Sequence, residues 1–169
     1  LAGNNTYTGK TLVQGGKLLV NGQQGSSPVW VSNGALLGGS GTIGALAATN
    51  GIGSPGNSPG KMNTGNLALH SSSVYTVEIN GATAGTGHDQ LAVTGTVALG
   101  GAQLQVSLAN GSAPGTEYVL IANNANDAVQ QTFAGLPEGA NITVNGIVLQ
   151  ITYKGGDGND VSLRHVNTP

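Results

Sequence analysis

The amino-acid sequence predicts an all-β fold, a parallel β-solenoid that ends in antiparallel β-hairpins. Apolar and polar residues alternate with a period of two in several short segments, and Gly or Asn-Gly pairs end these segments. Candidate helical windows are broken by Gly or by β-branched residues, and few have a capping residue. The 30 glycines of this 169-residue chain do not recur at every third position, which excludes a collagen triple helix.

Four segments carry the strand pattern: residues 74–79, 91–99, 102–108 and 117–122. Apolar and polar side chains alternate without a fault in the third of them, as is typical of a half-buried strand. The second repeats this pattern, which predicts four apolar side chains on one face: Leu91, Val93, Val97 and Leu99. Residues 123–131 form the only segment in which the sequence suggests a helical turn.

Short strand-like segments recur loosely along the first part of the chain. They lie at residues 15–22, 33–44, 64–73 and 100–106, and Gly or Asn-Gly follows or precedes each of them. A unit of roughly 20 residues suits a solenoid, in which every coil turns corners and stacks on the previous coil. A β-sandwich is the rival fold, and long antiparallel strands would favour it.

The C-terminal part of the sequence predicts two hairpins. Asn145-Gly146 lies between the apolar segments 142–144 and 147–153 and suits a type I′ turn, while residues 155–160 separate the second segment from 161–163. Such hairpins would cover the open edge and apolar face of a last coil. We therefore expect one continuous domain, with coils in residues 1–110 and a coil and hairpin cap in residues 111–169.

Composition excludes several partners. Five Lys and Arg residues are scattered along a chain of net charge −2, which leaves no basic footprint for nucleic acid or an anionic membrane. Only 7% of the residues are charged and none is cysteine, so Asn, Thr, Ser and Gly must coat the surface. A cysteine-free, neutral chain suits export in the unfolded state, where a premature disulfide would obstruct passage.

The segment Gly155-Gly156-Asp157-Gly158-Asn159-Asp160 resembles a calcium-binding turn of the Gly-Gly-x-Gly-x-Asp type. Such turns work as stacks, in which neighbouring turns share each ion, and this chain has a single copy. We therefore interpret the segment as a loop, in which Asp157 and Asp160 bond to their own backbone, and keep these two residues as a weak calcium candidate.

No arrangement of residues predicts catalysis. His88 and Asp89 are adjacent, but no Gly-x-Ser-x-Gly turn presents a nucleophile, and we expect His88 on a surface loop. His70 and His165 lack the spacing of metal ligands. The seven acidic residues are mostly isolated in sequence, which disfavours the paired carboxylates of glycosidases. We expect no enzymatic activity, no catalytic residue and no cofactor.

Trp30 is the only tryptophan and the candidate for a contact surface. The alternative is that it covers one end of the core, although alternation places it on the face opposite Val29 and Val31. Residues 23–28 precede it, and we expect them to form a loop off the coil.

Four segments give the chain its resemblance to a known family. Residues 3–22 ("GNNTYTGKTLVQGGKLLVNG") resemble the repeat of bacterial autotransporter passenger domains, with matching residues at Tyr7, Gly9, Thr11, Val13, Gly16 and Leu18. Residues 53–62 are similar to the loop before the last coils of such passengers, and residues 77–108 and 133–163 are similar to their C-terminal ends. The resemblance covers nearly the whole chain.

This resemblance implies a fold, a location and a function. It implies a right-handed parallel β-helix, exported through the outer membrane of a Gram-negative bacterium to the cell surface or the medium with the help of the protein's own translocator barrel. The function implied is that of a stalk whose last coils act as a folding nucleus. The alternative is an adhesin that binds host glycans or an identical passenger; an enzyme acting on polysaccharides is a third reading.

Overall fold

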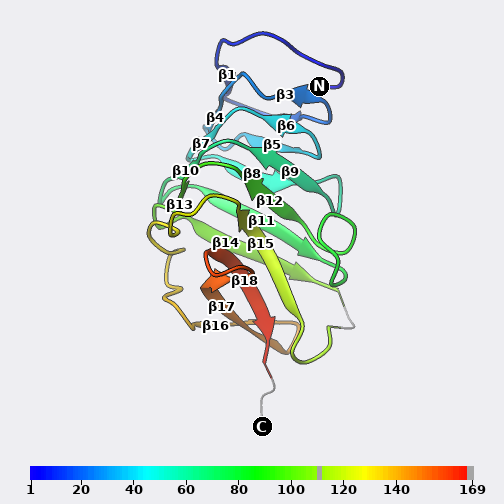
Figure 1. Ribbon diagram of the computed structural model, residues 1–169, viewed down its shortest axis with the longest axis vertical. Helices are drawn as coiled ribbons and strands as arrows, with labels where there is room; N and C mark the ends of the chain where they lie inside the picture. Colours follow the sequence, from blue (N-terminus) through cyan, green and yellow to red (C-terminus); the bar gives the residue numbers. More distant parts are fainter. Residues whose placement is uncertain (110–111, 167–169) are drawn as a thin grey trace.

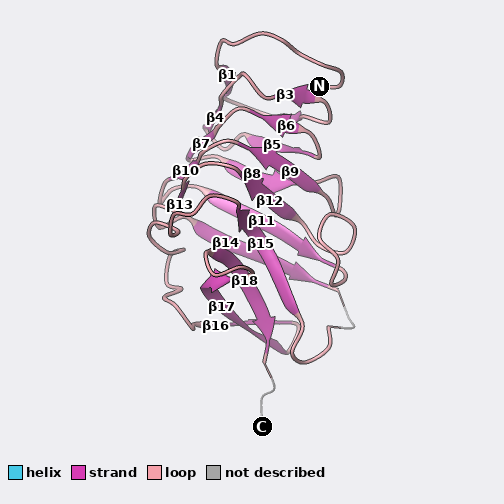
Figure 2. Ribbon diagram, viewed as in Figure 1, coloured by secondary structure: helices cyan, strands magenta, loops and turns pink. Residues whose placement is uncertain are grey.

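The structure, a computed structural model, describes residues 1–109 and 112–166. These residues form eighteen β-strands and no helix, as the magenta strands and pink loops of Figure 2 show. In this described part, no helix is therefore long and apolar enough to cross a membrane. The predicted helical turn at 123–131 is wrong: Asn123 ends a strand, and bends and an isolated bridge between Gln130 and Ala98 occupy the rest of that segment.

The strands belong to three sheets, which the chain visits in rotation (Figure 1). Sheet 1 is parallel throughout and contains β1 (Thr11–Val13), β4 (Val29–Ser32), β7 (Leu46–Thr49), β10 (Leu67–Leu69) and β13 (Val97–Ala98). Sheet 2 is also parallel and contains β2 (Lys17–Leu19), β5 (Leu36–Gly39), β8 (Ile52–Pro55), β11 (Val74–Ile79) and β14 (Gln103–Leu108).

Sheet 3 is mixed and has eight strands. Five successive strands pair in parallel: β3 (Gln23–Gln24), β6 (Thr42–Ile43), β9 (Lys61–Thr64), β12 (Gln90–Val93) and β15 (Glu117–Asn123). The last of them, β15, is the first strand of the cap. The remaining strands are antiparallel: β16 (Asn141–Val144), β17 (Ile147–Gly155) and β18 (Asp160–His165). The predicted all-β class is confirmed, and the rotation among sheets is consistent with a solenoid.

One turn of this rotation takes more of the chain near the C-terminal end than near the N-terminal end. In sheet 2, Lys17 pairs with Leu36 and Leu36 pairs with Ile52. In the last turn of the same sheet, Val74 pairs with Gln103, which lies much further along the sequence. The coil length expected from the sequence thus describes the first coils, and the last coil is longer.

The core lies between the three sheets and is built from residues in register. Val29, Leu46, Leu67 and Val97 follow one another across sheet 1, and each is at most 3% exposed. Alternation places every second side chain inside. The predicted strands at 74–79, 102–108 and 117–122 are confirmed as β11, β14 and β15, with their ends shifted by at most one residue.

One expected strand is divided by a corner. Residues 91–99 contain β12 in sheet 3 and β13 in sheet 1, with a turn at residues 94–96 between them. The four apolar residues expected on one face are all buried, but they line two walls of the core. Period-two alternation does not reveal this corner because the side chains on both sides of it point inward.

Both predicted hairpins are present in the cap. Asn145 and Gly146 have φ angles of 51° and 80° between β16 and β17, as a type I′ turn requires. Residues 156–159 connect β17 to β18. β15 pairs in parallel with β12 at one edge and antiparallel with β18 at the other, so it joins the coils to the hairpins. The expected boundary between residues 110 and 111 lies outside the described residues and stays a prediction.

Glycines at the corners let successive coils approach one another. A Cβ atom at Gly65 would overlap the backbone carbonyl oxygen of Gly44 in the preceding coil. Gly41 lies in the same way against Gly22 one coil earlier. At these corners the coils are therefore closer than a side chain permits.

We expect Gly65→Ala to lower the free energy of unfolding by about 1–3 kcal/mol, because the methyl group must displace backbone atoms of the adjacent coil. Gly15→Ala is the control, since Gly15 has open space around its Cβ position and a φ that other residues adopt. Urea denaturation of both variants measures the difference. Equal stability of the two variants would contradict the close stacking at this corner.

Candidate functional site

The outer face of sheet 1 carries a shallow apolar groove. Trp30 is 50% exposed there, while its neighbours Val29 and Val31 are buried, as alternation predicts. The groove has a volume of about 230 Å³, and Leu12, Ala47 and Trp30 contribute to its lining. Lys10 Nζ lies 4.6 Å from the centroid of the Trp30 ring. A contact role for Trp30 stays a prediction.

The expected loop at residues 23–28 is instead part of a coil. Gln24 lies in β3, and Gln24 and Ser27 are fully buried. Gln24 Nε2 donates to Thr11 Oγ1 (2.9 Å), and Ser27 Oγ donates to the carbonyl oxygen of Gly9 (2.7 Å). Polar residues are mostly exposed, so the sequence suggested a loop, whereas the Gln24 N–H and the Ser27 hydroxyl find acceptors here and Gln24 Oε1 is buried without a partner.

The segment 155–160 contains the end of β17, the turn at 156–159 and the start of β18, and one of its two acidic residues has a long-range partner. The backbone N–H of Asn123 donates to Asp160 Oδ1 (2.7 Å), which ties β18 to the end of β15. Burial raises the pKa of Asp160, and hydrogen bonds from the backbone of Asn123 and Asp157 lower it in part. The expectation of bonds only within the turn therefore misses Asn123.

In the described part of the chain, no three His, Cys, Asp or Glu residues lie close enough to hold a metal ion. Calcium binding by Asp157 and Asp160 stays a prediction. The two side chains have different surroundings, because Asp160 is 8% exposed and Asp157 lines a shallow open hollow of about 270 Å³.

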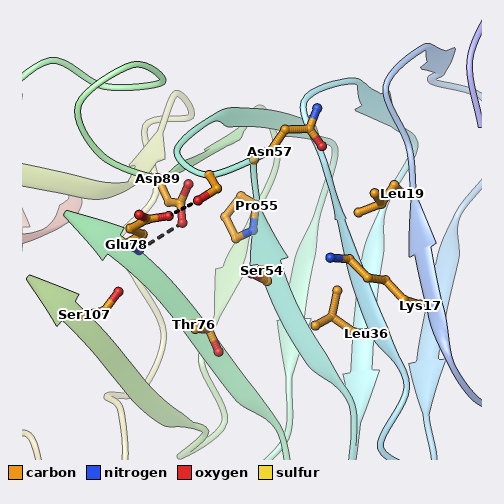
Figure 3. Close-up of a pocket in the computed structure, with 12 residues that line it drawn as sticks. Lys17, Leu19, Leu36, Ser54, Pro55, Asn57, Thr76, Glu78, Asp89 and Ser107 are labelled. Carbon is orange, nitrogen blue, oxygen red and sulfur yellow. Dashed lines mark hydrogen bonds between the residues drawn. The ribbon is translucent and has the colours of Figure 1, made fainter. Parts of the chain in front are cut away.

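The outer face of sheet 2 contains a second hollow of about 390 Å³, with acidic residues at one end (Figure 3). The backbone N–H groups of Gly60 and Glu78 donate to the two carboxylate oxygens of Asp89 at 2.8 and 2.9 Å. Ser58 Oγ donates to Glu78 Oε2 (2.6 Å). Lys17 lies across the hollow from this pair (Figure 3). Asp89 thus fastens the 56–60 loop to β11.

His88 is buried rather than on the surface as expected. Its side chain is 2% exposed, with Nδ1 3.2 Å from the carbonyl oxygen of Gly81 and Nε2 3.2 Å from that of Val119. Its ring is nearly perpendicular to the Tyr118 ring, at a centroid distance of 5.6 Å. β15 has a register shift between Val119 and Ile121, and the side chain of His88 lies beside it. Sequence alone does not reveal that the cap covers this residue.

One pair of side chains has the arrangement of a nucleophile and a base. Ser112 Oγ lies 3.0 Å from His165 Nδ1, and Tyr118 OH donates to Ser112 Oγ (2.6 Å). With Tyr118 as donor, the Ser112 hydroxyl hydrogen is free to point to His165, as general-base activation requires. Ser112 and Tyr118 also line a hollow of about 210 Å³. Local motifs do not reveal this pair because 53 residues separate its members.

The chain is similar to a segment of one curated protein. It is 31% identical to the extracellular serine protease of Serratia marcescens over an alignment of 169 residues. The alignment covers 93% of this chain and 15% of that protein, so the chain spans a small part of the relative's length. A search against family models found no match.

This similarity supports one expectation and contradicts another. The relative is named as an extracellular protein, which supports the expected extracellular location and, loosely, the resemblance to a secreted passenger region. The expectation that the chain has no enzymatic activity is contradicted, because the relative is named a serine protease. Sequence reasoning rested on the absence of a local nucleophile motif, and such a motif does not report on residues brought together by folding.

We expect opposite pH dependences for Asp89→Asn and Glu78→Gln. Burial raises the pKa of Asp89 above its ordinary 3.8, so its contribution to stability is lost as pH rises through the folded-state pKa. Hydrogen bonds from Ser58 and Asn80 lower the pKa of Glu78 below 4.5, so its contribution is lost as pH falls through the folded-state pKa. The quantity to compare is the free energy of unfolding of the native chain minus that of the variant. It should fall with rising pH for Asp89→Asn and rise with rising pH for Glu78→Gln.

Urea unfolding of the three proteins between pH 3 and 7 measures both differences. A rising difference for Asp89→Asn would show that hydrogen bonding to the carboxylate outweighs its burial.

Proposed function

We propose that this chain is a passenger segment of a surface-exposed or secreted autotransporter, folded as a right-handed parallel β-helix. Its function in this proposal is to act as a stalk and, through its C-terminal hairpins, as the folding nucleus of the coils. The protein's own translocator barrel is the partner during export. The resemblance of residues 3–22, 53–62, 77–108 and 133–163 and the extracellular relative support the assignment.

The position of β15 is the observation that carries the nucleus proposal. This strand presents one edge to β12 of the coils and the other to β18 of the cap. β17 and β18 contribute side chains with no exposure, among them Ile151, Val161 and Leu163. A strand held by the hairpins on one side offers an ordered edge on which the preceding coil can pair.

Several side chains connect the cap to the coils in addition to the sheet. Tyr75 OH of β11 donates to the carbonyl oxygen of Leu120 in β15 (2.9 Å), and the Tyr75 side chain is buried. The Tyr75 ring stacks on that of Phe133 at a centroid distance of 6.0 Å. Asn145 Nδ2 donates to the carbonyl oxygen of Leu108 (2.7 Å). These contacts make the stability of the last coils depend on the cap.

The energetic reason for nucleation at this end is the length of the connections. The hairpin of β16 and β17 closes over the short turn at Asn145 and Gly146, whereas each parallel pair requires a full coil, such as that from Leu67 to Val97, to be ordered first. Loop closure over the longer distance costs more entropy before any contact forms. The antiparallel cap can therefore form earlier than any isolated coil, and each later coil adds to an existing edge.

We expect Leu163→Ala to slow folding and Leu46→Ala to speed unfolding. Both residues are at most 3% exposed, so both substitutions should cost about 2–5 kcal/mol. If the cap is the nucleus, Leu163→Ala lowers the folding rate by about tenfold or more and changes the unfolding rate less. Leu46→Ala instead acts mainly by raising the unfolding rate. Stopped-flow folding and unfolding in urea measures both rates.

The reverse distribution of these rate effects would contradict nucleation by the cap. A chain truncated after residue 111 tests the same idea at equilibrium. It should fail to unfold cooperatively because β15 to β18 are missing. A truncation as stable as the full chain would leave the hairpins without a nucleating role.

Serine hydrolysis is a second candidate function, favoured by the Ser112–His165 pair and by the name of the relative. We expect a fluorophosphonate probe to label the native chain and not the Ser112→Ala variant, with Ser107→Ala of sheet 2 as the control that retains labelling. Mass spectrometry of the labelled peptides locates the modified residue. An unlabelled native chain would remove this candidate for residues 1–169 and leave the nucleus proposal unaffected.

A further inference from the structure

The outer face of sheet 1 presents one column of apolar residues that crosses all five strands. Leu12 pairs with Trp30, Trp30 with Ala47, Ala47 with Ala68 and Ala68 with Ala98. Register partners in adjacent strands lie about 4.8 Å apart, so the column is about 19 Å long. The strands β1, β4, β7, β10 and β13 lie one below another along one side of the molecule in Figure 1.

The two halves of this column have different shapes. Leu12 and Trp30 are large side chains that project from the face, with 54% and 50% of their surface exposed. Ala68 and Ala98 present only methyl groups, so that half of the column is low. Ala47 and Ala68 line the groove and Ala98 does not, so the hollow lies at Ala47 and Ala68, in line with the two projections.

We propose that this face binds a second copy of the chain through a twofold axis that lies in the interface, parallel to the strands, and passes over Ala47. A half-turn about such an axis brings the two faces together and reverses the order of the column. Trp30 then meets Ala68 of the second copy and Leu12 meets its Ala98, while both contacts recur with the copies exchanged. Each large side chain fills the hollow of the other copy, which lowers the exposed apolar area on both.

The charges on this face permit such a contact. Among the described residues, those that line the groove include no Asp, Glu, Lys or Arg, and His70 at its edge is the one titratable side chain. Two copies that meet here therefore bring no Asp, Glu, Lys or Arg of the groove lining face to face. The charge of Lys10 lies beside this groove, over the Trp30 ring. Lys10 is the charge that a strongly anionic partner would meet here, whereas a second copy places apolar side chains against apolar side chains.

The area of the column sets the strength of the association. Five short strands bury roughly a few hundred Å² per copy, less than the ~800 Å² per partner of a typical stable complex. The dimer should therefore be weak in dilute solution. Many copies held close together on one surface would associate more strongly, because a linked second contact forms at a high effective concentration.

Single-cysteine crosslinking tests the proposed axis directly, because the chain contains no cysteine. In Ala47→Cys, the two thiols of a dimer face each other across the axis. Thr76→Cys is the matched control, since Thr76 is also a half-buried, outward residue of a strand paired on both sides, β11 of sheet 2. Under diamide oxidation we expect disulfide-linked dimer to form at least tenfold faster for Ala47→Cys.

Second substitutions in the Ala47→Cys chain test the two halves of the contact. Trp30→Ala removes the projection and Ala68→Gln fills the hollow, so each should lower the crosslinking rate to that of Thr76→Cys. Ser107→Gln, at an exposed position of sheet 2, should leave the rate unchanged. Thermal melts verify that every variant retains the fold.

Equal rates for the two single-cysteine chains would overturn the proposal, as would a fast rate that does not depend on Trp30 and Ala68. A neutral saccharide is the other occupant that suits an exposed tryptophan beside polar side chains. A saturable change in Trp30 fluorescence with cellotetraose, together with slow crosslinking, would assign the groove to a saccharide and overturn the proposal.

Discussion

Every part of this structure depends on parallel backbone pairing between successive coils. A chain with 7% charged residues and no cysteine has few other long-range connections, so the sheets must stack in register from one coil to the next. Register determines which residues lie above one another, and it thereby produces both the continuous aliphatic core and the columns on the outer faces. It also forces the corners to approach within a strand spacing, which only glycine permits at positions such as Gly65.

The cap solves the problem that such stacking creates at its end. A parallel stack always leaves a free edge, and the antiparallel pairing of β15 with β18 occupies it. The junction between the two kinds of pairing contains polar groups that elsewhere would be exposed. The carbonyl oxygen of Val119, beside the register shift, accepts a hydrogen bond from Gln90 Nε2 (2.9 Å) and lies 3.2 Å from His88 Nε2. These contacts satisfy a backbone group at the irregular part of the ladder.

The features that sequence could predict are those set by neighbouring residues. Alternation identified β11 and β14, and Asn145-Gly146 identified the hairpin turn, because both signals act within a few residues. The corner at residues 94–96, the burial of Gln24 and His88, and the contact between Asp160 and Asn123 depend on which coil lies next to which. The Ser112–His165 pair belongs to the same class, since folding alone brings its members together. The outward position of Trp30 was predictable, but its alignment with Ala68 required the register.

The greater length of the later coils has a consequence for how such a chain can diversify. Most of the added residues lie at one corner, between sheets 2 and 3, where the connection lengthens from residues 40–41 to 56–60 and then to 80–89. The stacked strands on either side keep their partners despite these additions. Insertions at this corner therefore leave the scaffold intact and project from a single side. Evolution can vary the length of the loops there, within the contacts that join neighbouring loops such as that between Gly60 and Asp89, and an engineer can graft new segments at the same place.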